Sequence, residues 1–159
     1  MSAYGVFHTI LSLPPIFLGL LAFAQHRSFD PRTSAGKWYA ITMFLATISG
    51  FGFLPTRAFV PGQVLTLVTL AFLLGGLFTI RGTLRAAGYV QAICLTTTYL
   101  LLMVFTTTEG LTRLPVGKPF AAGPEDPALL PVRVGLLVAF AVALGMQIVK
   151  LRKRPAVGC

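Results

Sequence analysis

The stretch that decides the fold runs from Ala87 to Glu109 and reads AGYVQAICLTTTYLLLMVFTTTE, with no charged residue before its last position. At about 1.5 Å of rise per residue, a helix of this length crosses a hydrocarbon layer of about 30 Å. The stretch also carries Gln91 and two threonine triplets. A helix this polar in lipid turns its amide and hydroxyl groups inward, against neighbouring helices. The stretch therefore predicts a membrane-spanning helix with other helices around it.

The composition excludes an ordinary soluble domain. Of the 159 residues, 55% are hydrophobic and 11% are charged, and the mean hydropathy is +0.82. Soluble domains carry about 25% charged residues, so this chain cannot cover a water-facing surface. The formal net charge of +9 comes from basic residues between apolar stretches and in the tail, without aromatic–basic interleaving. We therefore assign these charges to anionic lipid and to orientation in the membrane, and we expect no nucleic-acid partner.

Four further apolar stretches flank the central one. The first lacks a preceding basic region and a clear A-x-A cleavage site, so we interpret it as a retained helix and not as a signal peptide. We predict an all-α integral membrane helical bundle with five transmembrane helices in a single domain. A four-helix bundle, with the first stretch cleaved off, is the alternative. The predicted spans are 4–24, 37–54, 61–80, 87–108 and 129–149.

Small side chains recur every fourth residue in three of the flanking spans. This spacing places them on one face of each helix, where they permit close approach of a neighbouring helix. We therefore predict helix-packing roles for Thr42, Ala46, Gly50, Ala71, Gly75, Gly135, Ala139 and Ala143.

The basic residues divide unevenly between the two predicted sides of the membrane. Nine of the 13 lie in the first loop, around the third loop and in the tail: Arg27, Arg32, Lys37, Arg81, Arg85, Lys150, Arg152, Lys153 and Arg154. The remaining four lie on the other side: Arg57, Arg113, Lys118 and Arg133. The positive-inside rule then places the N-terminus outside and the C-terminus in the cytoplasm. The connection 110–128, rich in Pro and Gly, faces outward and is interpreted either as a lid or as a mobile loop.

Glu109 is the acidic residue that directly follows an apolar stretch. If it lies below the headgroups, desolvation favours its neutral form, and it becomes a candidate proton or cation site. Gln91 and Thr98 on the same helix are candidate polar groups of such a site. In the alternative, the threonines bond back to carbonyl groups of their own helix, and Glu109 lies in water. Arg113 can then pair with Glu109 at i,i+4.

His8, in the first span, is interpreted as a hydrogen-bonded packing residue, with a proton site or a haem ligand as the alternative. The only other histidine, His26, follows 18 residues later. This separation is about 27 Å along a straight helix, so the two cannot hold one haem within a subunit. Cys94 and Cys159 have no C-x-x-C spacing, and no catalytic or nucleotide-binding motif is present. We predict no metal site, no catalytic residue and no cofactor.

Three segments carry a resemblance to a known family: Gly19–Ala22, Ser34–Tyr39 and Ala46–Gly50. They resemble a family of small uncharacterised bacterial predicted membrane proteins with a four-helix core. That family has a His-Arg-x-x-Gly-Arg-x-Tyr loop before its second helix. Gly36, Lys37 and Tyr39 match the end of this loop, whereas its histidine and first arginine fall on Arg32 and Thr33. The resemblance implies a multi-helix bundle in the bacterial inner membrane and no activity.

The leading functional hypothesis is a small transport, channel or accessory component with a polar fourth helix. The alternatives are a non-transporting assembly subunit of a larger membrane complex and a membrane redox protein that uses haem or quinone. An enzyme is the less favoured class. The expected partners are the lipid bilayer and either a second copy of the chain or another membrane protein.

Overall fold

The computed structural model describes residues 3–53, 61–81 and 85–153, and all regular structure within these ranges is helical. The five α-helices are α1 (Ala3–His26), α2 (Ser34–Gly50), α3 (Pro61–Phe78), α4 (Arg85–Arg113) and α5 (Leu130–Arg152). Three short 3₁₀ segments adjoin them: η1 (Phe51–Phe53), η2 (Thr79–Arg81) and η3 (Pro127–Leu129). The prediction of an all-α fold is confirmed. Leu54, the end of the second predicted span, lies outside the described residues.

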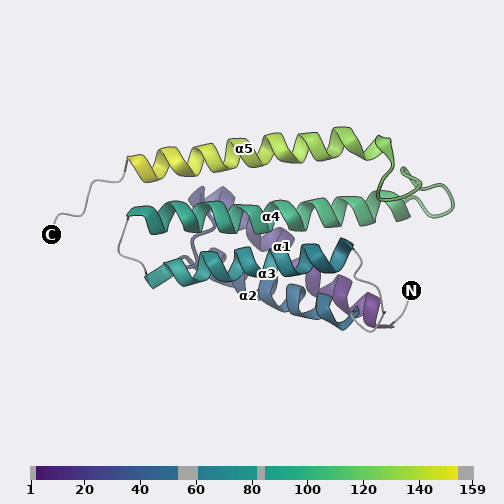
Figure 1. Ribbon diagram of the computed structural model, residues 1–159, viewed down its shortest axis with the longest axis horizontal. Helices are drawn as coiled ribbons and strands as arrows, with labels where there is room; N and C mark the ends of the chain where they lie inside the picture. The colour runs from purple at the N-terminus through teal and green to yellow at the C-terminus, as the bar shows by residue number, and fades with distance from the viewer. Residues whose placement is uncertain (1–2, 54–60, 82–84, 154–159) are drawn as a thin grey trace.

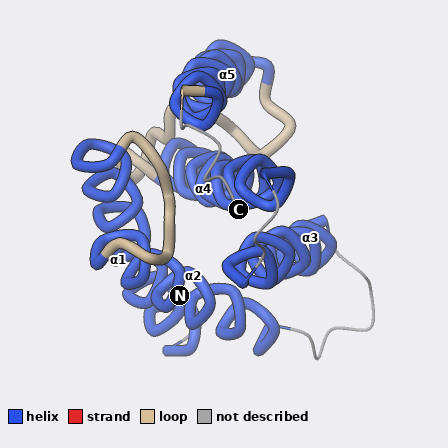
Figure 2. The backbone as a smooth tube through the Cα atoms, turned by 90° about the vertical axis from the view of Figure 1, so that its left-hand side faces the viewer, coloured by secondary structure: helices blue, strands red, loops and turns tan. Residues whose placement is uncertain are grey.

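Successive helices run in alternating directions along one long axis. As a result, α1 begins and α5 ends at opposite ends of the bundle (Figure 1). α1 packs along α2, and α4 lies between α3 and α5 (Figure 2). α5 packs mainly against α4, so it lies outside the group formed by α1 to α4.

Three helices are long and apolar enough to cross a membrane: Ala3–His26, Ala86–Arg113 and Pro127–Arg152. The apolar part of α3, Gln63–Phe78, is shorter, and α2 has 17 residues. The three long helices are compatible with a membrane-embedded protein, whereas the five predicted spans stay a prediction.

Large apolar side chains also lie on the outside of the bundle. Phe17, Leu20 and Phe78 are 68%, 60% and 79% exposed, and α5 adds Leu137 and Val142 at 54% and 58%. Soluble monomers rarely expose contiguous apolar patches larger than a few hundred Å². This surface is therefore suited to lipid and not to water.

The core lies where α1, α2 and α4 meet around Phe29, a residue of the loop between α1 and α2. The centroid of the Phe29 ring is 5.3 Å from that of Tyr39 and 5.1 Å from that of Tyr99. Tyr39 is fully buried. Tyr99 reaches α1 because Gly19 leaves room for it: a Cβ atom at Gly19 would lie 2.4 Å from the Tyr99 ring. The first loop thus folds back into the bundle and supplies its central ring.

The connection after α4 has hydrogen-bonded structure of its own. α4 continues to Arg113, and the backbone of Ala121 then returns to donate to the Leu111 carbonyl at 3.1 Å. The Asp126 carboxylate accepts from the backbone amides of Ala128 at 2.9 Å and Ala122 at 2.7 Å. These two bonds stabilise the charged carboxylate and lower the pKa of Asp126 below its ordinary value. Asp126 therefore fixes the turn that leads into α5.

Replacing Gly19 with alanine is expected to destabilise the protein, because the new methyl group meets the Tyr99 ring at 2.4 Å. Overpacking of this kind costs about 1–3 kcal/mol. Gly135→Ala in α5 is the matched control, since nothing lies within 4 Å of its Cβ position and alanine is the better helix former. Unfolding midpoints in mild detergent should fall for Gly19→Ala and stay or rise for Gly135→Ala. Equal midpoints would contradict the close packing of α1 on α4.

Candidate functional site

Tyr39 and Thr98 link α2 to α4 in the centre of the bundle. The Tyr39 hydroxyl lies 2.7 Å from Thr98 Oγ1, and Thr98 itself donates to the Leu95 carbonyl at 2.8 Å. A hydroxyl has a single proton. Because that of Thr98 goes to its own helix, Tyr39 is the donor and Thr98 the acceptor between the two helices. Thr98, a predicted site residue, is fully buried and thus makes a helix-to-helix contact.

Gln147 and Thr96 repeat this arrangement between α5 and α4. Gln147 Nε2 donates to Thr96 Oγ1 at 2.7 Å, and Thr96 donates to the Ala92 carbonyl at 2.6 Å. Both side chains are buried, at 2% and 3% exposure. This bond is the buried polar link that holds the peripheral helix α5 in register with α4.

His8 and Ser49 form a third link of the same kind, between α1 and α2. Ser49 Oγ donates to the Ala46 carbonyl at 2.7 Å, and His8 Nδ1 lies 2.7 Å from the same Oγ. The proton in this contact therefore belongs to His8 Nδ1. Tyr4 donates to the Ser49 carbonyl one turn nearer the start of α1. The structure thus places His8 in a contact between helices.

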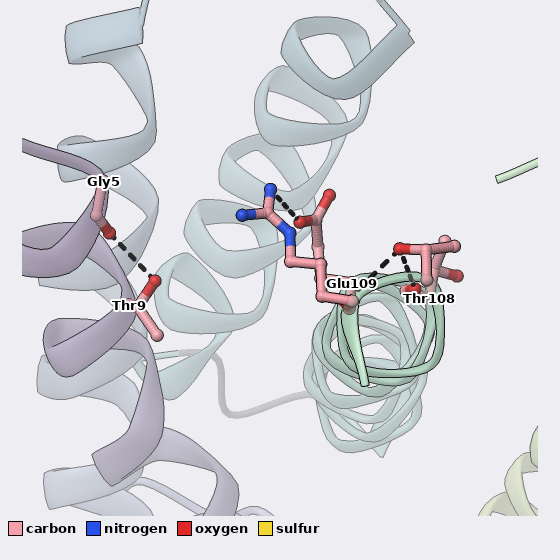
Figure 3. Close-up of polar contacts among 6 residues, drawn as sticks. Gly5, Thr9, Thr108 and Glu109 are labelled. Atoms are coloured by element: carbon pink, nitrogen blue, oxygen red, sulfur yellow. Dashed lines mark hydrogen bonds and ion pairs between the residues drawn. The ribbon is translucent and has the colours of Figure 1, made fainter. Parts of the chain in front are cut away.

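Glu109 lies on the outside of α4 near its end. Its carboxylate is 2.5 Å from Arg113 Nη2, and both side chains are 56% exposed (Figure 3). This is the i,i+4 pair that a continuous helix predicts, and exposed pairs of this type contribute about 0–1 kcal/mol. Figure 3 also shows the carbonyl of Thr108 accepting a hydrogen bond from the next turn, where Thr112 is the donor. Glu109 therefore forms an exposed ion pair at the end of α4 and does not lie inside the bundle.

Five of the seven threonine hydroxyls along α4 donate to carbonyl groups of the same helix. Thr97 donates to Ile93 at 2.8 Å, and Thr107 donates to Met103 at 2.7 Å. With Thr96 and Thr98 they follow the back-bonding pattern that was the alternative to a polar path. Their donor capacity is therefore already used within α4.

The predicted small-residue positions divide into two groups. Ala46, Gly50 and Gly75 contact a neighbouring element, whereas Ala143 is half-buried beside a cavity and Ala139 is exposed. Ala71 and Gly135 are exposed, and Thr42 is half-buried and donates to the Trp38 carbonyl. The closest approach of α3 to α4 is made instead by Gly76, where a Cβ atom would lie 2.8 Å from the Leu95 side chain. Neither Gly76 nor Gly19 belongs to the repeats that the sequence displays.

Two adjoining cavities lie in the crease formed by α1, α4 and α5. A cavity of about 60 Å³ lies where the first loop meets the start of α4 and the end of α5. We call it the polar cavity, because its lining includes Asp30, Arg32, Gln91, Gln147 and Lys150. A cavity of about 200 Å³, the apolar cavity, follows further along α4 and α5, and its lining includes Leu20, Phe23, Leu100, Met103 and Phe140.

One aromatic ring and one hydrogen bond lie between the two cavities. Phe29 borders both of them. The bond between Gln147, which lines the polar cavity, and Thr96, which lines the apolar cavity, marks their boundary. Gln91 lines the polar cavity, and its buried Nε2 has no hydrogen-bond partner among the described residues. Sequence reasoning singled out Gln91, whereas Lys150 and Arg32 were assigned to orientation alone.

No protein-family model, curated protein sequence or solved structure matches this chain. Within residues 3–53, 61–81 and 85–153, no three His, Cys, Asp or Glu side chains lie close enough together to hold a metal ion.

The bond between Gln147 and Thr96 is expected to show as a coupling energy in a double-mutant cycle. Gln147→Met and Thr96→Val each remove one side of it with little change in volume. Hydrogen bonds between membrane helices contribute about 0.6–2 kcal/mol, which is the coupling we expect from unfolding free energies in detergent. A second cycle that pairs Gln147→Met with Thr97→Val is the control and should be additive. Additivity in both cycles would contradict the link.

Proposed function

We propose that the chain is a multi-pass protein of the bacterial inner membrane, with all five α-helices in the bilayer. The alternating course of the helices supports five spans. At about 1.5 Å per residue, the 17 residues of α2 and the 18 of α3 extend about 26 and 27 Å. A shortfall of a few ångströms against a layer of about 30 Å is accommodated at modest cost by local thinning and by snorkelling side chains.

The basic residues support an orientation with α1 beginning outside and α5 ending in the cytoplasm. Lys150 at the end of α5 donates to the His26 carbonyl at the end of α1. Arg32 in the first loop donates to the Ile80 carbonyl after α3 at 2.5 Å. The segments with most of the Lys and Arg therefore meet at one end of the bundle, as the positive-inside rule requires of a cytoplasmic face.

The packing of α1 supports a five-helix protein over a four-helix one. α1 contributes His8 to the link with Ser49 and the space at Gly19 that Tyr99 fills. The Tyr99 hydroxyl also donates to the Ile16 carbonyl of α1 at 3.2 Å. Cleavage of α1 would leave these partners without their contacts. The resemblance to small bacterial membrane proteins with a four-helix core supports a helical bundle of the inner membrane, but not the fifth helix, and it adds no activity.

Reporter fusions in bacteria test the five spans and the orientation. A reporter active only in the cytoplasm should be active when fused after His26 or after Lys153. A reporter active only outside the cytoplasm should be active when inserted at Gly117. Fusions after His26 and Lys153 that report opposite sides would contradict the proposal.

Within the membrane, we propose a non-conducting role as an accessory or assembly subunit. The observation that carries this proposal is the way in which the polar groups of α4 are used. The buried hydroxyls of Thr96 and Thr98 are bonded both to their own helix and to a neighbouring one, and the Glu109 ion pair lies outside the bundle. A conducting path needs polar groups that face a continuous opening, and these groups face one another.

The outer face of α5 supports association with another membrane protein or with a second copy. Gly145 is exposed, with nothing within 4 Å of its Cβ position, and Ala141 is exposed one turn earlier. Small residues on a lipid-facing helix allow another helix to approach closely. α5 is also the helix with the fewest neighbours inside the bundle, because it packs mainly against α4.

Reconstitution and co-purification test this role together. Liposomes with the wild-type protein or with Glu109→Gln should show the same ion and proton flux as empty liposomes. The protein extracted from its own membrane should elute as a homo-oligomer or with one stoichiometric membrane partner. Gly145→Leu should weaken that association without lowering the unfolding midpoint. Flux that disappears in Glu109→Gln would overturn the proposal in favour of a channel.

A further inference from the structure

The polar cavity and the apolar cavity together have the shape and chemistry of one amphiphilic ligand. We propose that the crease between α1, α4 and α5 binds an anionic phospholipid of the cytoplasmic leaflet, with its headgroup phosphate in the polar cavity and one acyl chain in the apolar cavity. This inference rests on the membrane embedding and orientation proposed above. It does not depend on whether the protein conducts ions.

The polar cavity is lined by two cations and one carboxylate. Lys150 is half-buried, and one of the three N–H donors of its ammonium group binds the His26 carbonyl. One guanidinium N–H group of Arg32 donates to the Ile80 carbonyl. Asp30 is partly engaged already, because its Oδ1 accepts the backbone amide of Arg32 at 3.0 Å. The remaining donors and the surplus of one positive charge favour an anion.

Gln91 supplies an independent sign of a missing acceptor. Gln91 lines the polar cavity and is 9% exposed, and its buried Nε2 has no hydrogen-bond partner among the described residues. Buried polar groups are paired in more than nine cases in ten, so an orphan donor beside a cavity indicates a ligand acceptor. A phosphate oxygen is an acceptor only, and it also pairs with Lys150 and Arg32. Basic pockets between membrane helices on the cytoplasmic side bind acidic headgroups in this way.

The apolar cavity has the position and the apolar lining to hold part of an acyl chain. At about 200 Å³ it exceeds the engineered cavity of about 150 Å³ that holds benzene in another protein. From Gln91 to Met103, the two cavities follow α4 for 12 residues, or about 18 Å. That distance is close to half of a hydrocarbon layer of about 30 Å. The crease therefore runs from the headgroups of one leaflet to the middle of the bilayer.

Lipid titration of the purified protein in detergent, followed by native mass spectrometry, tests the inference. Phosphatidylglycerol should bind about tenfold more tightly than phosphatidylcholine. Both lipids carry the phosphate, but phosphatidylcholine adds a cationic choline group, which Lys150 and Arg32 repel. Lys150→Gln and Arg32→Gln should each remove most of this preference. Arg152→Gln, a basic residue at the same end that does not line the polar cavity, is the matched control and should retain it.

Gln91→Met separates a ligand-binding role from a structural one. It should weaken phosphatidylglycerol binding while the unfolding midpoint of the lipid-free protein stays the same or rises, because an orphan donor is removed. A lowered midpoint with unchanged binding would assign Gln91 to folding and overturn the inference.

Two further arms identify the source of the phosphate and the role of the apolar cavity. Inorganic phosphate alone should not raise the unfolding midpoint, whereas phosphatidylglycerol should. Ala143→Leu, which fills the apolar cavity, should weaken binding of the lipid. Equal binding of both lipids, or equal stabilisation by inorganic phosphate, would overturn this inference and leave the membrane proposal standing. Reporter fusions with the wrong orientation would instead remove the proposed topology whatever the lipid result.

Discussion

The packing of the bundle depends on serine and threonine hydroxyls that donate a hydrogen bond within their own helix and accept one from a neighbouring helix. A serine or threonine in a helix donates its proton to a carbonyl of the preceding turn and keeps its lone pairs free to accept. Ser49, Thr98 and Thr96 each do this, and each accepts a bond from a different neighbouring helix. The donors come from α1, α2 and α5. Each polar side chain is thereby satisfied twice, within its own helix and across to another.

These links explain why α4 is the central helix although its sequence is the most polar of the five. Within a single turn it receives hydrogen bonds from Tyr39 of α2 and from Gln147 of α5. Tyr99 in the same turn reaches α1. Between the links, contacts without polar groups complete the packing: the rings around Phe29 and the close approach of α3 at Gly76. The polarity that is costly in lipid is therefore what fixes the register of the neighbouring helices.

Gln91 is an exception to this pairing of buried polar groups, and the exception indicates a ligand site. One turn away, Thr96 and Gln147 satisfy each other fully, whereas Gln91 Nε2 has no partner among the described residues. Well-formed proteins satisfy their buried polar groups, and the exceptions concentrate at functional sites. The exception here lies beside two basic side chains and at the head of an apolar cavity. A bound amphiphile accounts for the unpaired donor, the two basic side chains and the apolar cavity together. A purely structural role does not connect these three features.

The sequence by itself determined that this protein is helical, where most helices lie, and that Glu109 can pair with Arg113 if the helix continues. Hydropathy and i,i+4 spacing are properties of one segment, so 61–80 and 129–149 anticipated α3 and α5 to within a few residues. Only the tertiary structure decided which polar groups meet, since Tyr39 and Thr98 are 59 positions apart and Gln147 and Thr96 are 51 apart. It also decided that Gly19 and Gly76, which lie outside the regular repeats, allow the close approach of α1 and α3 to α4. When every face of a helix is apolar, periodicity does not say which face turns inward; the fit of neighbouring side chains does.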